Sequence, residues 1–300
     1  MRALQYRTYG GPEVLEVGEA PEPHAGPGQI RIAVRGASLN PIDRRGYRGA
    51  GAEGPLTGAG RLGWDAAGVV DEVGEGVEGV AAGDEVFGKG SETIAEYAVL
   101  DAWAPKPPSV DWAVVAAAGV VGETGERGLR LLGVSSGQTV FVDGGSGGVG
   151  AVAVQMAMGR GARVIASAGE SNQDYVRGLG AIPVVHGEGV ADRVRAAVGG
   201  EHVDAVLDVA GRTPVEELVG LVREPTQLLS IANPAAVDAG GRVSFGGADA
   251  RAMPALREVA DQLGRGTLRI EVRTFPLEEA TEAYRVSESG HGRGKLVVVP

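Results

Sequence analysis

The 300-residue chain contains no cysteine. It therefore has neither a disulfide bond nor a thiolate ligand for a metal. Histidine occurs only four times, at positions 24, 186, 202 and 291, in unrelated segments of the chain. We interpret these histidines as surface or core residues and expect no metal site.

Long apolar runs and excess positive charge are also lacking. No stretch of about 18 apolar residues is present, so no membrane-spanning helix is expected. Residues Met1–Arg7 have no apolar signal-peptide core. The net charge of −11 leaves no broad basic surface for a phosphate backbone. These absences predict a cytoplasmic protein that binds neither membranes nor nucleic acid.

The first third of the chain predicts a β-rich domain with many turns. Residues 38–63 are rich in glycine, proline and arginine and are expected to be irregular. Alternating polar and apolar residues, or runs of β-branched residues, indicate strands at 2–6, 15–17, 29–35, 66–73, 84–87 and 93–100.

From about residue 111 the pattern changes to strands that alternate with helices. Helices are expected at 111–119 and 125–132, and βα units then recur to residue 263. This alternation predicts an α/β fold with a doubly wound parallel sheet. The final strand, 295–299, is expected to rejoin the first domain.

One segment of the second part has the order of a dinucleotide-binding fingerprint. A buried strand, 139–143, precedes Gly145-x-Gly147-x-x-Gly150, and an apolar helix follows at 151–158. The three glycines allow a tight turn, a close approach of the backbone to a pyrophosphate, and close packing of the helix. The alternative is a glycine-rich turn without a ligand, since the chain has 51 glycines.

Several motifs together resemble one family. They are Ala37-Ser-Leu-Asn-Pro-Ile-Asp43, Leu62-Gly-Trp-Asp-Ala-Ala-Gly-Val-Val70, the turn at 74–87, the loop at 147–150, and the ending 275–284 with 292–297. In this order and spacing they resemble the zinc-independent, quinone oxidoreductase-like (enoyl reductase-like) branch of the medium-chain dehydrogenases/reductases.

The resemblance implies a particular division of the chain. A GroES-like β-rich domain would comprise residues 1–115 and 268–300, around a Rossmann domain at 116–267. It also implies a homodimer paired through an edge strand of the Rossmann sheet, expected at 242–245.

The same resemblance bears on metal chemistry. Zinc alcohol dehydrogenases hold their catalytic zinc with a cysteine in the first motif and a His-Glu pair in the second. Here these positions hold Asn40 and Trp64-Asp65, and a catalytic zinc needs about three protein ligands. We therefore expect no zinc, and hydride transfer to an already polarised acceptor rather than zinc-dependent alcohol oxidation.

The expected cofactor is NADPH rather than NADH. An NAD site places an acidic residue at the end of the second strand, about 20 residues past the loop. Ser167 stands there, and Ser171 and Asn172 follow as donors for a 2′-phosphate. Glu170 in the same turn would either point at the ribose, which favours NADH, or point out to solvent.

The resemblance implies further site residues. It places Thr124 near the nicotinamide and Asn40 where the family has a side chain that contacts the substrate or the nicotinamide. The phenol of Tyr47 is a further catalytic candidate, because it can donate a hydrogen bond or a proton to an enolate. The donor to the enolate oxygen would be Asn40 or Tyr47. The substrate is expected to meet Asn40, Asp43, Arg44, Tyr47 and Trp64. Lys295 and Arg293 would reach the cofactor or fix the terminal strand. The other expected cofactor-binding residues are Gly145, Ser146, Gly147, Gly148, Val149, Gly150, Ile231, Asn233, Phe245 and Gly246.

These expectations predict a metal-free NADPH-dependent reductase. NADPH would give a hydride to a quinone or an α,β-unsaturated carbonyl, and a proton would come from Tyr47 or water. The five glycines from Gly46 to Gly58, both included, fit a biosynthetic enoyl reductase or reductive cyclase of a polyketide-like substrate as well as a quinone reductase. The alternative is a protein of the same fold that binds NADPH as a sensor and catalyses nothing.

Overall fold

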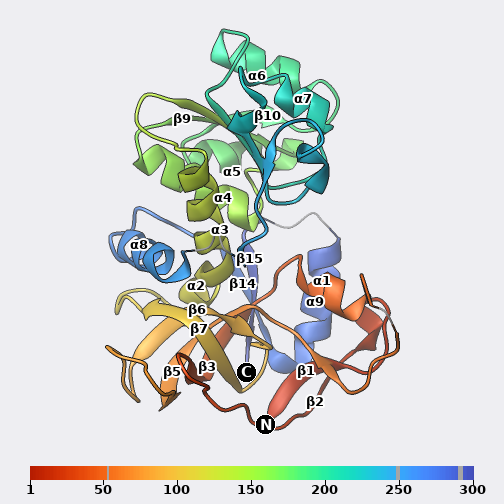
Figure 1. The fold of residues 1–300 in the computed structure, drawn as a ribbon, viewed down its shortest axis with the longest axis vertical. Helices are drawn as coiled ribbons and strands as arrows, with labels where there is room; N and C mark the ends of the chain where they lie inside the picture. The colour runs from red at the N-terminus through yellow and green to blue at the C-terminus, as the bar shows by residue number, and fades with distance from the viewer. Residues whose placement is uncertain (53, 248–250, 290–292) are drawn as a thin grey trace. The chain divides into compact units, whose positions relative to one another are not determined.

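The computed structural model describes residues 1–52, 54–247, 251–289 and 293–300. The chain forms two compact units, which are labelled by element in Figure 1. Unit 1 comprises Met1–Val120, Ala252–Gly266 and Ile270–Pro300. Unit 2 comprises Val121–Arg251 and Thr267–Arg269.

Unit 2 contains a six-stranded sheet whose neighbouring strands are all parallel. The spatial order is β10-β9-β8-β11-β12-β13, the order of a dinucleotide-binding Rossmann sheet. This confirms the predicted doubly wound fold, with β13 at one edge. The strands are β8 (Thr139–Asp143), β9 (Arg163–Ala168), β10 (Ile182–Val185), β11 (Ala205–Asp208), β12 (Leu228–Ser230) and β13 (Arg242–Val243).

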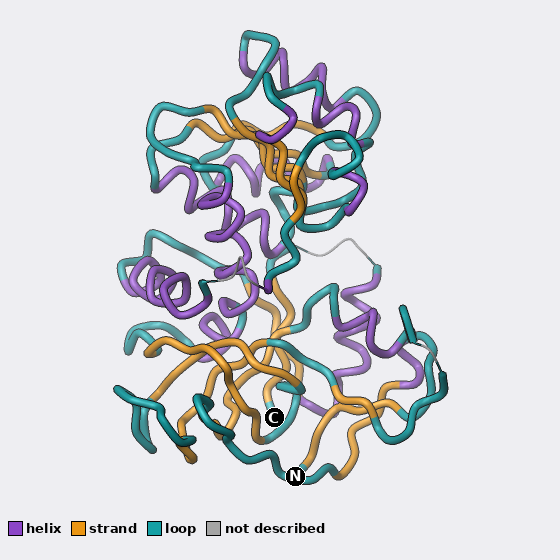
Figure 2. Tube along the Cα trace, in the orientation of Figure 1, coloured by secondary structure: helices purple, strands orange, loops and turns teal. Residues whose placement is uncertain are grey.

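Helices connect these strands and lie on both sides of the sheet, purple against orange in Figure 2. The apolar run of α4 is almost wholly buried because it follows the central strand of the sheet. The helices of this part are α3 (Ala118–Leu131), α4 (Gly148–Gly159), α5 (Gln173–Gly178), α6 (Val190–Val198) and α7 (Val215–Val219).

Unit 1 contains the β-rich fold. Its large sheet has the order β14-β15-β3-β5-β6-β7, and β7 also pairs with β3, so β3, β5, β6 and β7 close on themselves. A second sheet has the order β2-β1-β4. The strands are β1 (Arg2–Tyr6), β2 (Leu15–Glu19), β3 (Ile30–Ser38), β4 (Gly60–Arg61), β5 (Asp65–Val73), β6 (Glu85–Ser91), β7 (Tyr97–Pro105), β14 (Val272–Pro276) and β15 (Lys295–Val299).

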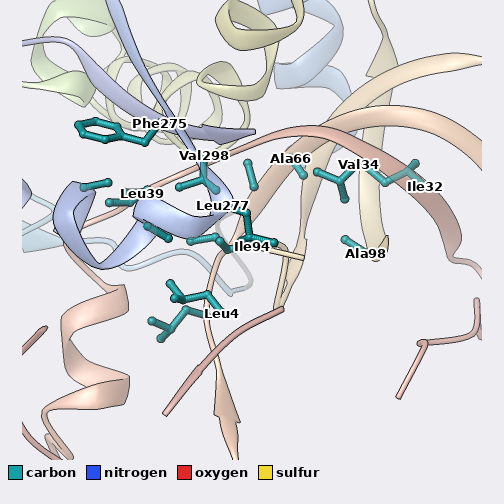
Figure 3. Packing of buried hydrophobic residues seen from close by; sticks show 14 of the residues in the cluster. Leu4, Ile32, Val34, Leu39, Ala66, Ile94, Ala98, Phe275, Leu277 and Val298 are labelled. Atoms are coloured by element: carbon teal, nitrogen blue, oxygen red, sulfur yellow. The ribbon is translucent and has the colours of Figure 1, made fainter. Parts of the chain in front are cut away.

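The core of unit 1 joins segments from both ends of the chain. Leu4, Ile32 and Ile94 from the N-terminal strands and loops belong to one buried cluster with Leu277 and Val298 (Figure 3). Strand β15 pairs with β3 and β14, as predicted for the final strand. The helices of unit 1 are α1 (Asp43–Tyr47), α2 (Trp112–Ala116), α8 (Ala252–Gly264) and α9 (Ala280–Glu288).

Three local predictions were wrong. Residues 38–63 contain α1, a five-residue helix whose Asp43 and Tyr47 are buried, so tertiary packing stabilises a segment of weak helical propensity. Helix α3 begins at Ala118 rather than at 125. Strand β7 begins at Tyr97 rather than at 93, because Thr93 and Ile94 bond to the 62–65 segment instead.

Helix α8 groups with unit 1 although it lies within residues 116–267, the range expected for the Rossmann domain. The backbone N–H of Trp103 in β7 lies 3.0 Å from Met253 Sδ at the start of this helix. Among the residues that the structure describes, no helix is long and apolar enough to cross a membrane.

Candidate functional site

The glycine loop after β8 is shaped by close backbone contacts. Gly144 has a φ of 99°, and the N–H of Gly145 donates to Ser167 O at 2.8 Å. A Cβ at Gly150 would lie 2.1 Å from Gly144 O, and a Cβ at Gly145 would lie 2.6 Å from Ala166 Cβ. The strand and the helix therefore approach each other closely only because both positions are glycine.

Gly147 differs from these two glycines. A Cβ there would meet only Gly144 O, at an ordinary 3.5 Å, so the space beside it is open. Gly147 is also the N-cap of the 12-residue helix α4 and supplies no side-chain cap. The first N–H groups of a helix lack intrahelical partners and favour an anion. The segment with Ser146, Gly148 and Val149 thus fits the pyrophosphate of a dinucleotide.

At the carboxyl end of β9, Ser167 has a different role from the one predicted. Its side chain is fully buried; its hydroxyl donates to Asp143 Oδ1 and accepts from the N–H of Gly144 at 2.9 Å. Burial raises the pKa of Asp143. Ser167 therefore fixes the glycine loop, and its buried hydroxyl is engaged within the protein, which argues against the predicted bond to a 2′-phosphate.

The other residues expected at the ribose end are more accessible. Glu170, Ser171 and Asn172 form a 3-10 turn with none of its residues buried. Ser171 and Asn172 remain candidate donors for a 2′-phosphate. Glu170 is exposed beside them, so it would repel a phosphate at close range.

Helix α3 holds a buried ion pair next to Thr124. Arg127 Nε lies 2.8 Å from Glu123 Oε1, with 4% and 0% of the two side chains exposed. Arg127 Nη1 also donates to Ser244 O at 2.8 Å and to Ser244 Oγ at 2.7 Å. Its Nη2 donates to Thr124 Oγ1 at 3.4 Å. Arg127 thus ties Thr124 to the end of β13.

The remaining residues expected to bind the cofactor lie after β12 and β13. Phe245 is 61% exposed, and Gly246 follows it with a φ of 99°. Ile231 follows β12 directly, and Asn233 caps a short 3-10 turn by accepting from the N–H of Ala235. All of them lie beyond the carboxyl ends of parallel strands, where ligands of such sheets bind.

In unit 1, Asn40 lies within a buried polar network. Its Nδ2 donates to Asp65 Oδ1 at 2.8 Å and to Ser38 O at 3.3 Å, while its Oδ1 accepts from Lys295 Nζ at 2.7 Å. Lys295 Nζ also donates to Leu39 O. Both amide donors of Asn40 are therefore engaged, which argues against the predicted bond to an enolate oxygen.

Lys295 fixes the terminal strand rather than reaching out of it. Its side chain is buried, and desolvation lowers the pKa of its ammonium although the Asp65 and Asp43 carboxylates oppose this. Arg293 forms an exposed ion pair with Glu271 at 3.0 Å. Of the two roles left open for these cations, the structure favours the fixing of β15.

Tyr47 and Asp43 share the buried face of α1. The ring of Tyr47 meets the ring of Tyr284 edge-on, with centroids 5.6 Å apart. Its hydroxyl donates to Glu288 Oε1 at 2.6 Å, and burial raises its pKa well above the ordinary value. These contacts argue against the predicted role of Tyr47 as proton donor, because its buried phenol is bonded to the partly buried carboxylate of Glu288.

Asp43 carries a buried carboxyl group. Its Oδ2 accepts from Asn40 N at 2.8 Å and from the hydroxyl of Tyr284 at 2.7 Å. Its Oδ1 is buried without a hydrogen-bond partner among the described residues. Burial raises the pKa of Asp43 to about 6.

A pocket of about 420 Å³ opens beside α1. Trp64 and Ile42 line it and are 44% and 47% exposed, which is unusual for large apolar side chains. Arg61 and Glu92 form an ion pair in its wall. The full lining is Ile42, Asp43, Arg45, Gly46, Arg61, Leu62, Gly63, Trp64, Ser91 and Glu92.

The pocket contains two of the expected substrate residues, Asp43 and Trp64. Tyr47, Asn40 and Arg44 are not part of its described lining. Conversely, sequence analysis missed Arg45, Arg61 and Glu92. Recognising α1 would have identified Arg45, because residues three apart on a helix share a face and Ile42 lies on the same face.

Two family models match parts of the chain. Residues 26–104 match the alcohol dehydrogenase GroES-like domain, and residues 179–298 match the zinc-binding dehydrogenase domain. A solved NAD-dependent alcohol dehydrogenase is 30% identical, with a TM-score of 0.85 over all of both chains. The quinone oxidoreductase from Coxiella burnetii is 29% identical, with a TM-score of 0.84 over 100% of this chain and 99% of that one.

The chain belongs to the medium-chain dehydrogenases/reductases, in their quinone oxidoreductase-like branch. Among curated members, the NADPH-dependent alkenal/one oxidoreductase of Arabidopsis thaliana is 28% identical over 100% of this chain and 80% of its own length. The spectinabilin polyketide synthase system protein NorB of Streptomyces orinoci is 35% identical over 96% of this chain. The chain spans only 14% of the length of NorB.

The name of the second family model raises the question of zinc in this medium-chain dehydrogenase/reductase. Among the described residues, no group of three or more His, Asp or Glu side chains is placed to hold a metal ion. Asn40 and Asp65 bond to each other, and Trp64 lines the pocket. His291 lies outside the described residues.

Proposed function

We propose that this protein is a metal-free, NADPH-dependent reductase of quinones or α,β-unsaturated carbonyl compounds. The observation that carries the proposal is the glycine loop of unit 2, which is closed at Gly145 and Gly150 but open at Gly147. Its relatives named as NADPH-dependent alkenal/one oxidoreductase and quinone oxidoreductase support the same reaction class. Bound NADPH would supply the hydride.

The residues of unit 2 would bind and orient the cofactor. The backbone of Gly145–Gly150 and the start of α4 would hold the pyrophosphate. Ser171 and Asn172 would bond the 2′-phosphate, and Ile231, Asn233, Phe245 and Gly246 would flank the nicotinamide half. Thr124, tied to Ser244 through Arg127, would keep this region in place.

The pocket of unit 1 would take the acceptor. Trp64, Leu62 and Ile42 offer apolar walls for a planar conjugated group, and a volume of about 420 Å³ suits a small organic molecule. Because the phenol of Tyr47 is committed to Glu288, we assign the final proton to water. The positions where zinc ligands would be needed hold Asn40, Trp64 and Asp65. The carbonyl group of the acceptor would therefore be polarised by the substrate's own conjugation rather than by a metal ion.

Purified protein mixed with NADPH and a series of quinones and enones tests the proposal. We expect absorbance at 340 nm to fall, without added metal and after treatment with a chelator, and more efficiently with NADPH than with NADH. A protein that binds NADPH but oxidises it with none of these acceptors would be a sensor rather than a reductase. Activity that zinc restores after chelation would contradict the metal-free mechanism.

We also propose a homodimer formed through β13. This strand lies at the edge of the unit 2 sheet, and an edge strand has unpaired N–H and C=O groups that another strand can bond. Light scattering after gel filtration is expected to give twice the chain mass of 30.5 kDa. A mass of one chain at micromolar concentration would contradict the dimer.

A further inference from the structure

Four arginines near the pocket of unit 1 differ in their ion pairs: Arg44, Arg45, Arg48 and Arg61. Arg48 forms a bidentate pair with Glu288, with Nη2 to Oε2 at 2.7 Å. This bond, together with the nearby charge of Arg44, lowers the pKa of Glu288. Arg61 is paired with Glu92 in the pocket wall. Arg44 acts on Glu288 only through its nearby charge, and Arg45 has no ion-pair partner among the described residues.

The helical geometry of α1 explains this division. Asp43 and Tyr47, four residues apart, lie on its buried face. Arg44 and Arg48, also four apart, lie on the face toward Glu288. Ile42 and Arg45, three apart, lie on the face that lines the pocket. An exposed cation is thus set beside an exposed apolar surface in one hollow.

The acidic groups of the same lining do not neutralise Arg45. Glu92 is bonded to Arg61. Asp43 is buried, and its Oδ2 is bonded to Asn40 and Tyr284. Its charge also interacts with Lys295 in the core. Within the described part of the chain, the guanidinium of Arg45 is therefore left without an ion pair and can bind a ligand in the pocket.

We propose that Arg45 selects substrates in which the conjugated carbonyl carries an oxyanion, either a carboxylate or a phosphate monoester. The planar part would lie against Trp64 and Ile42, and the oxyanion would accept from the planar guanidinium fork of Arg45. This inference rests on the proposed function for the carbonyl acceptor, but binding of the oxyanion requires only the pocket. Arg45 is a specificity-determining residue and transfers no proton.

Ligands that share a carbon skeleton but differ in charge separate the contribution of charge to binding from that of shape. We would compare 4-phenylbut-3-en-2-one with its para-carboxylate and its para-phosphate ester as substrates. The corresponding saturated ketones serve as non-reacting ligands in calorimetric binding experiments. The wild-type protein is expected to bind at least one anionic ligand about tenfold or more tightly than the neutral one, a range typical of a charge-assisted bond. Added salt should reduce the difference.

Variants of Arg45 test whether this residue causes the preference for anionic ligands. Arg45→Gln is expected to raise the KM and the Kd of the favoured anionic ligand about tenfold and to change those of the neutral ligand less than twofold. Arg45→Lys should keep part of the preference, because it keeps the charge but loses the fork. Arg35→Gln removes the same charge from an exposed position on β3 and should leave both constants unchanged.

The outcomes distinguish the two proposals. Selective binding of the anionic ketones that is lost in Arg45→Gln supports the anion site even if no enone is reduced, in which case only the proposed function fails. Reduction of enones without any preference for the charged ones overturns the anion site and leaves the proposed function standing. Equal losses for charged and neutral ligands in Arg45→Gln, or no binding by the wild type, also overturn it.

Discussion

In unit 2 the candidate cofactor site is made mainly of backbone, whereas in unit 1 the pocket is made of side chains. The glycine loop works because Gly145 and Gly150 have no Cβ and Gly147 leaves open space. The pocket depends on α1, the segment around Trp64 and the Ser91-Glu92 turn, brought together by the fold. A backbone site follows from a contiguous motif, but a side-chain site requires knowledge of which face each residue occupies.

The two units also differ in how charge is buried. Unit 2 buries the pair Glu123–Arg127 within one helix. Unit 1 buries Lys295 with Asp43 and Asp65, three residues far apart in the sequence. The first pair is local and visible as an i, i+4 spacing, whereas the second depends on the return of the chain to unit 1.

The largest effect is expected from the buried charge of unit 1. Lys295→Met would leave the buried carboxylates of Asp43 and Asp65 without their cation and should lower the free energy of unfolding by about 3–5 kcal/mol. Urea denaturation measures this loss. Arg293→Gln, which breaks an exposed ion pair with Glu271, should cost less than about 1 kcal/mol. A small loss in Lys295→Met, together with a raised KM for NADPH, would restore Lys295 as a cofactor ligand.

A second large effect concerns Asp43 and pH. Burial raises its pKa from 3.8 to about 6, so its protonated form is favoured by folding. Its contribution to stability is fully present below pH 4 and is lost as the pH rises through 6. The shift of about 2 units corresponds to ~3 kcal/mol.

The isosteric variant Asp43→Asn removes this titration. Relative to wild type, its free energy of unfolding should increase between pH 4.5 and 7.5 by an amount of that order. The contributions of other titrating groups to the pH dependence are the same in both proteins, so they cancel in the difference between the two free energies of unfolding. A difference that does not change with pH would show that Asp43 titrates in the folded protein as it does in the unfolded chain.

The backbone site of unit 2 is tested by a pair of glycines. In Gly147→Ala the new Cβ meets nothing closer than 3.5 Å, so stability should change by less than about 1 kcal/mol. NADPH binding, followed by fluorescence titration, should weaken about 10- to 100-fold because the Cβ occupies the space for the pyrophosphate.

At Gly150, in contrast to Gly147, a substitution is expected to affect the stability of the protein itself. Gly150→Ala places a Cβ 2.1 Å from Gly144 O and should destabilise the protein itself by about 1–3 kcal/mol. Gly159→Ala, where a Cβ meets nothing within 4 Å, is the control for both measurements. Unchanged NADPH affinity in Gly147→Ala would place the pyrophosphate elsewhere.

The smallest effect is expected from Tyr47→Phe. It removes the hydrogen bond to Glu288, which keeps its bond to Arg48, so stability should fall by about 1 kcal/mol. The kcat for enone reduction should stay within about twofold of wild type. Tyr9→Phe, at an exposed tyrosine, is the control. A tenfold fall in kcat without a loss of stability would identify Tyr47 as the proton donor after all.

More of unit 2 than of unit 1 could be predicted from the sequence. The fingerprint and the parallel sheet follow from local patterns, since each βα unit carries its own periodicity, whereas the edge position of residues 242–245 was expected from the family resemblance. Ser167 was placed correctly at the end of β9, but its orientation was not, because only the register between β8 and β9 brings its hydroxyl to Asp143. In unit 1, helix α1 was not predicted. Its sequence, Asp-Arg-Arg-Gly-Tyr, has no apolar residues at helical spacing, because its two buried residues are Asp43 and Tyr47.

By itself, the sequence determined the α/β class, the family and the glycine loop, because these depend on residue types at fixed local spacing. Tertiary structure decided which side chains remain available for chemistry. It placed Tyr47, Asn40 and Lys295 in the core, where burial and hydrogen bonding commit their polar groups. It left Arg45 at the pocket without an ion pair to any residue that the structure describes. The physical reason is that a polar group is committed by the partners that folding brings to it, and these partners lie up to 256 residues away along the chain.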